Sequence, residues 1–117
     1  MRSPLLSTLA LASLLAGCGS VCENVPSQTV TSPSGALKAV VFSRNCGATT
    51  GFNTQVSVLR ANEALVDGGG NTFISGASVP IVLHWSSDSA LHISGVGDAS
   101  PIKQNLHVSG IVVTYVR

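Results

Sequence analysis

The stretch from Ser32 to Leu59, SPSGALKAVVFSRNCGATTGFNTQVSVL, decides the fold. It opens with a turn at Ser32 to Gly35, because Pro presets φ for the first corner position and Gly adopts a positive φ without a Cβ clash. Residues 36–43 are rich in Val and Phe, and residues 53–60 alternate polar with apolar side chains. The nine residues between them are too many for a two-residue hairpin turn. We therefore predict two strands joined by a wide loop.

Strand patterns continue to the end of the chain. Turn signals recur at intervals of about 8 to 12 residues, and no helical periodicity is seen after residue 17, which favours an all-β fold. The sequence predicts a small antiparallel sheet, a meander or a sandwich. The clearest further strands are expected at 79–85, 90–94 and 110–117, with short or weak strands at 27–31, 71–75 and 102–108.

Period-two alternation along these strands predicts one buried face. The residues expected to supply most of it are Val40, Phe42, Val56, Val58, Leu83, Trp85, Leu91, Ile93, Val113 and Tyr115. The same alternation places His84 and His92 on the opposite, solvated face.

Length and charge narrow the classes of function. A chain of 117 residues forms at most one domain. Its six basic and five acidic residues are scattered and give a net charge of +1. Without a basic patch, a nucleic-acid partner is not expected.

The predicted organisation is a signal peptide at 1–17, a lipidated cysteine and short tether at 18–26, and a single small β domain at 27–117.

The N-terminus has the features of an export signal. Arg2 supplies a positive charge, and Leu5 to Ala16 is an apolar run that is shorter than the roughly 20 residues of a membrane-spanning helix. The run ends in Leu15-Ala16-Gly17-Cys18, which resembles the lipobox of bacterial lipoproteins. The resemblance implies cleavage before Cys18 and acylation of this residue, and several acyl chains give a stable membrane anchor. The alternative is an ordinary signal peptide that leaves Cys18 as a thiol.

The predicted location is the bacterial cell envelope. Gly19 and Ser20 follow the cysteine with no aspartate beside it, which favours the periplasmic face of the outer membrane over the inner membrane. The membrane is then a partner of the protein through the lipid, and an envelope protein is a candidate second partner.

Cysteine usage agrees with export. If Cys18 carries lipid, Cys22 and Cys46 remain as a pair, and an oxidising envelope favours their disulfide. The bond would close a loop of about 25 residues and contribute roughly 3 to 4 kcal/mol on the chain-entropy model. Two independent thiols or a metal pair are the alternatives, which need a reducing compartment or more ligands.

Most of the chain after residue 17 resembles a family of small bacterial lipoproteins and exported proteins. The shared motifs are an SP-x-G turn, a KAVVF strand, a CGATT loop and a TQVS strand, which are found here at 32–35, 38–42, 46–50 and 54–57. An acidic residue is usual at the third turn position, where this chain has Ser34. The family has no established activity, so the resemblance implies a fold and no catalytic residue.

The sequence offers two candidate reactive sites, a metal site of histidines and an aspartate, and a nucleophilic serine. His84, Asp88 and His92 would share one face of a helix as metal ligands, but Ser86 to Ser89 is a turn, so that the two histidines should lie on neighbouring strands as satisfied surface imidazoles. No serine lies in a Gly-x-Ser-x-Gly motif. We therefore predict no catalytic residue, no metal site and no cofactor.

The loop at residues 46–52 is the best candidate for a function. A disulfide to the tether would present Arg44, Thr49, Thr50 and Phe52 in a fixed arrangement, and rigid loops bind with a smaller ordering cost. The alternative is that the disulfide merely stabilises a wide loop.

The sequence predicts a non-enzymatic interaction or structural module anchored by lipid. A periplasmic inhibitor or immunity-type protein is the alternative, and a small metal protein or hydrolase built on His84, Asp88 and His92 is a third hypothesis.

Overall fold

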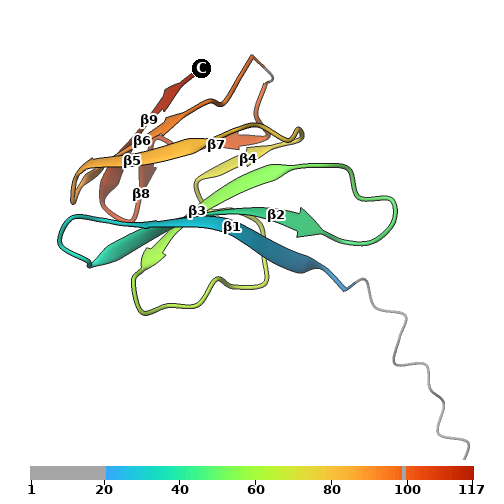
Figure 1. Cartoon of the computed structure of the whole chain (residues 1–117), viewed down its shortest axis with the longest axis horizontal. Helices are drawn as coiled ribbons and strands as arrows, with labels where there is room; N and C mark the ends of the chain where they lie inside the picture. The colour runs from blue at the N-terminus through green and yellow to red at the C-terminus, as the bar shows by residue number, and fades with distance from the viewer. Residues whose placement is uncertain (1–20, 99) are drawn as a thin grey trace, which may run out of the picture.

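The computed structural model describes residues 21–98 and 100–117, and these form two β-sheets packed face to face with no helix (Figure 1). The all-β prediction is therefore confirmed. The first sheet has the strand order β1-β2-β3-β4-β7 and is antiparallel throughout. Its strands are β1 (Glu23–Thr31), β2 (Leu37–Asn45), β3 (Thr54–Arg60), β4 (Phe73–Ser75) and β7 (Lys103–Gln104).

The second sheet is mixed, with the order β5-β6-β9-β8. Its strands are β5 (Val82–Ser87), β6 (Ala90–Ser94), β8 (His107–Val108) and β9 (Ile111–Val116). The expectation of antiparallel pairing is wrong for β6 and β9, which run parallel. After β6 the chain crosses to the first sheet to form β7 and then returns through β8, so that β9 enters the second sheet in the same direction as β6.

The hairpin at the centre of the sequence forms as predicted. The Gly35 N–H donates to the Ser32 carbonyl (2.9 Å). Gly35 has a φ of 80°, which residues other than Gly rarely adopt. Beyond the turn, Val41 lies opposite Val56 and Ala39 opposite Val58 in the ladder between β2 and β3.

The first strand is longer than predicted. It begins at Glu23 rather than Ser27, because Glu23 to Pro26 pair with the end of β2. The predicted tether at 18–26 therefore overlaps the sheet by four residues. Pro26 is accommodated at a bulge between Pro26 and Gln28, where a missing N–H is tolerated.

The main core lies between the two sheets. Ala39, Val41, Val56 and Val58 of the first sheet are buried there. They pack against a set from the second sheet that includes Leu83, Trp85, Leu91, Ile93 and Val113, as predicted. Trp85 also donates its indole N–H to the Val30 carbonyl of the first sheet (2.9 Å).

A second, smaller cluster corrects the prediction of one buried face. Val40 and Phe42 are buried, but they point away from the second sheet and pack with Leu59 and Leu65. The segment between β3 and β4, which includes Leu65, covers this outer face. Tyr115, the remaining predicted core residue, is only partly buried at the edge of the main core.

Candidate functional site

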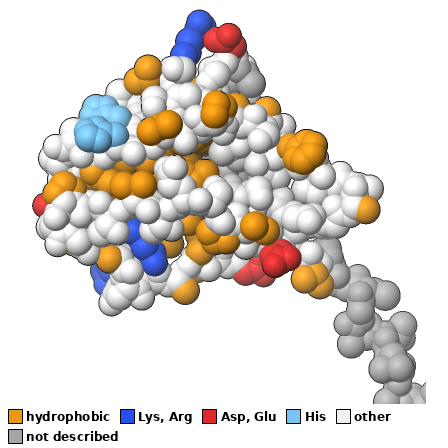
Figure 2. Space-filling view, viewed as in Figure 1, with side chains coloured by type: hydrophobic (Ala, Val, Ile, Leu, Met, Phe, Trp, Pro, Cys, Tyr) orange, Lys and Arg blue, Asp and Glu red, His pale blue; other side chains and the backbone are white. Residues whose placement is uncertain are grey.

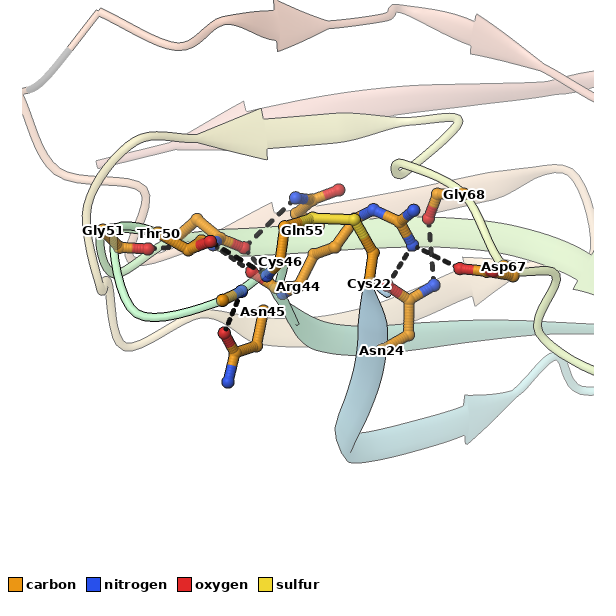
Figure 3. The surroundings of a disulfide bond; sticks show 12 residues. Cys22, Asn24, Arg44, Asn45, Cys46, Thr50, Gly51, Gln55, Asp67 and Gly68 are labelled. Atoms are coloured by element: carbon orange, nitrogen blue, oxygen red, sulfur yellow. Dashed lines mark hydrogen bonds and ion pairs between the residues drawn. A yellow bond between two sulfur atoms is a disulfide. The ribbon is translucent and has the colours of Figure 1, made fainter. Parts of the chain in front are cut away.

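The predicted disulfide between Cys22 and Cys46 is confirmed, with an S–S distance of 2.09 Å. Each cysteine lies one residue beyond the pair formed by Glu23 and Asn45, at the ends of β1 and β2. The bond therefore closes the open end of this strand pair, where the loop between β2 and β3 begins (Figure 3).

Arg44 braces the base of this loop. Its Nη1 donates to Asp67 Oδ1 and to Asn24 Oδ1, both at 2.9 Å (Figure 3). Asn24 in turn donates to the carbonyls of Val66 and Gly68, each at 2.9 Å. Only 19% of the Arg44 side chain is exposed. Arg44 was predicted to be presented by the loop, but its charge is engaged in joining β1, β2 and the segment before β4.

Asn53 closes the loop from its other end. The Arg44 N–H donates to Asn53 Oδ1 (2.8 Å), and Asn53 Nδ2 donates to the carbonyls of Arg44 (2.7 Å) and Gly51 (3.2 Å). Thr50 Oγ1 accepts from the Cys46 N–H (2.9 Å), and the Thr50 N–H donates to the Gly47 carbonyl (3.0 Å). The Thr50 hydroxyl thus holds the loop from within.

Thr49 and Phe52 are the predicted loop residues that remain open to solvent. Thr49 is exposed, and Phe52 is 86% exposed. Phe52 lines two hollows of about 400 and 390 Å³. The first is lined by polar groups such as Asn45, and the second extends to Ile74 and Ile102. The loop therefore presents an aromatic ring on a backbone fixed at both ends.

Sequence reasoning missed Asn24, Asn53, Asp67 and Ile102. Asn53 follows Gly51 and Phe52 directly before a strand. An Asn at such a position commonly forms hydrogen bonds with nearby backbone groups, so that the role of Asn53 could have been predicted from the sequence. The other three meet the loop from segments that are distant in the sequence.

The two histidines of the β5–β6 hairpin lie together, as the hairpin prediction implies. His84 and His92 are paired in register, and their rings stack with centroids 6.1 Å apart. His92 Nε2 lies 3.0 Å from Ser86 Oγ. Asp88 does not join them, because its Oδ1 accepts from the Ser34 N–H (2.7 Å) of the opposite sheet. Within residues 21–98 and 100–117, no three His, Cys, Asp or Glu side chains are grouped to hold a metal ion.

Cys18 and the predicted signal peptide lie outside the described residues. In the part of the chain that the structure describes, no helix is long and apolar enough to cross a membrane. No family model, no curated protein and no solved structure matches this chain.

Proposed function

We propose that the protein is a lipid-anchored bacterial envelope protein that acts as a non-enzymatic interaction module, with the braced loop at 46–53 as its contact surface. The single observation that carries this proposal is the pairing of extreme exposure with rigidity: Phe52 is 86% exposed on a loop whose ends are tied by a disulfide and by Asn53. A loop whose backbone is already fixed loses little backbone entropy on binding.

The disulfide supports the extracytoplasmic part of the proposal, because such bonds persist in oxidising compartments. The lipid anchor is supported by the Leu15 to Cys18 motif. Anchoring at Cys18 would hold the loop near the bilayer, since Cys22 follows four residues later and is bonded to the residue that starts the loop.

The contact surface is tested by photo-crosslinking in cells that produce the full chain. A photoreactive phenylalanine analogue in place of Phe52 should give a defined adduct, to lipid or to an envelope protein. The same analogue in place of Val112, which is 49% exposed on the second sheet, is the matched control. Equal labelling at both sites would count against the loop as the contact surface. A single adduct to a hydrolase or a toxin would favour the inhibitor alternative.

The anchor is tested separately by replacing Cys18 with Ser. The wild-type protein should carry acyl mass on the peptide that begins at Cys18 and should sediment with membranes, whereas the variant should do neither. An unmodified wild-type Cys18 in a protein that is released from the cell would overturn the anchored part of the proposal.

A further inference from the structure

The most exposed apolar side chains gather at one end of the molecule. In the described ranges, the four highest exposed fractions among large hydrophobic residues are those of Phe52 (86%), Val21 (78%), Ile102 (73%) and Val66 (63%). They come from four segments that are far apart in the sequence. We call these four residues the apolar rim.

The disulfide is the point that the four segments share. Val21 precedes Cys22, and Phe52 and Ile102 line the same hollow as Cys46. Val66 is held nearby, because its carbonyl accepts from Asn24 Nδ2 (2.9 Å). Figure 1 shows the start of β1 and the loop between β2 and β3 at the same end of the sandwich, away from the turn between β5 and β6. In the same view, Figure 2 shows separate apolar side chains at this end, among others that are spread over the face.

The charges beside the rim balance. Arg44 is paired with Asp67, and the Lys103 ammonium donates to the Gly70 carbonyl (3.0 Å). With Glu23, which is exposed next to Cys22, these described charged residues are two acidic and two basic groups. A neutral surface with apolar tips is suited to the region between lipid headgroups and acyl chains, where burial of apolar area drives binding. Attraction to anionic lipid is not needed.

The predicted anchor explains why these side chains are left exposed. Val21 is the third residue after Cys18, and three extended residues span at most about 10 Å. Lipid on Cys18 therefore keeps Val21, and with it the disulfide end, within about 10 Å of the bilayer surface. Docking the rim then requires no further diffusion, so that a few apolar side chains are sufficient.

We propose that the apolar rim docks onto the lipid bilayer and orients the sandwich with its disulfide end against the membrane. This inference rests on the proposed lipid anchor and names the bilayer as the partner of the braced loop. In this orientation two turns point away from the membrane, the one between β1 and β2 and the one between β5 and β6. The hydrogen bond between Ser34 and Asp88 joins these two turns.

The test uses the full, lipid-modified chain in vesicles of phosphatidylethanolamine and phosphatidylglycerol that contain brominated phosphatidylcholine. Phe52→Trp places a fluorescent ring on the rim, and Val112→Trp places one near the opposite end, where the Val112 N–H donates to the Ser89 carbonyl. The wild type supplies the baseline, because its only Trp, Trp85, is 7% exposed in the core. Flotation of the vesicles first establishes that each protein is anchored.

The expected result is that the emission added by Trp at position 52 shifts to shorter wavelength and is largely lost to bromine, with little dependence on salt. The emission added at position 112 should keep its wavelength and remain quenchable by aqueous acrylamide. Two outcomes would overturn docking but not the anchor. In the first, the Phe52→Trp and Val112→Trp proteins both float with the vesicles and are quenched equally by bromine. In the second, the Phe52→Trp protein floats but is quenched only by acrylamide. In the second case, a protein adduct at position 52 in cells would identify a protein as the partner instead. Failure of the wild type to float would overturn the anchor, and the docking with it.

Discussion

The two sheets bury their residues in different ways. The central strands of the first sheet are covered on both faces, by the second sheet on one side and by the segment around Leu65 on the other. Within the described residues the second sheet is covered on one face only, so that β5 alternates between exposed and buried residues from Val82 to Ser86. Alternation therefore identifies the inward residues of the second sheet, whereas β3 has six consecutive buried residues and shows no such pattern in its burial.

The largest effect should come from breaking the contact between the sheets at Trp85. Trp85→Ala should lower the free energy of unfolding by about 3 to 5 kcal/mol, because it leaves a cavity and removes the indole bond to Val30. Trp85→Phe, which keeps most of the packing, should cost much less. Urea unfolding followed by circular dichroism measures both, and equal costs for the two variants would show that packing at this site contributes little.

The disulfide joins two strands of the first sheet, and its loss should rank second. Cys46→Ala should lower the free energy of unfolding by about 3.5 kcal/mol on the loop-entropy model, since the two cysteines are 24 residues apart. Reduction of the wild type should lower the midpoint of unfolding as far as the Cys46→Ala substitution does. A midpoint that does not respond to reductant would contradict the expected stabilisation.

A matched pair of valines compares the outer faces of the two sheets directly. Val40 is 3% exposed beneath the segment that contains Leu65, and Val112 is 49% exposed on the second sheet. Val40→Ala should cost about 2 kcal/mol, from two buried methyl groups and the space they leave. Val112→Ala should stay within about 0.5 kcal/mol of the wild type. Similar costs would mean that the segment over Val40 opens in solution.

Local sequence signals were sufficient for most strands and for the disulfide. The turn at Ser32 to Gly35 and the strand at 90–94 are found where expected, because local turn chemistry and alternation determine them. The outward orientation of Val40 and Phe42 was not predictable, since it depends on a covering segment that follows β3 in the sequence. The parallel pairing of β6 and β9 likewise depends on a crossover between sheets.

The candidate loop could be located from its sequence but not interpreted in detail. Cys46 and Phe52 indicated a braced loop with an open aromatic ring, and both features are present. The engagement of Arg44 was not predictable, because its partners Asn24 and Asp67 are 20 and 23 residues away and become neighbours only in the folded chain.

Tyr115 joins the second sheet to the first and should make stability depend on pH in alkali. Its single O–H is shared between the carbonyls of Asn105 (2.7 Å) and Thr72 (3.1 Å), and burial raises its pKa from 10.0 to about 12. The folded state then holds this proton more tightly than the unfolded state, so that stability is complete below pH 10 and falls as pH rises toward 12.

Because the ring is only half-buried, we expect a loss of about 1 kcal/mol across this range. The measurement is the difference between the wild type and Tyr115→Phe, which removes the contribution of groups that the two proteins share. A difference that stays constant from pH 9 to pH 11 would contradict the prediction.

The smallest effect is expected on the open face of the second sheet, at the histidine pair. His84 is exposed and His92 half-buried, and their rings meet each other and Ser86 rather than any core residue. Replacing both with Gln removes the imidazoles but keeps polar side chains on a solvated face, so that the free energy of unfolding should change by no more than about 0.5 kcal/mol. Envelope localisation and crosslinking at position 52 should also be unchanged, because the disulfide end does not depend on this hairpin.

Elemental analysis of protein purified without chelators completes the test of the histidine pair. A transition metal that is present in the wild type and lost in the double variant would show that two stacked imidazoles on neighbouring strands are a binding site. In that case the open face of the second sheet, and not the braced loop, would be the functional surface.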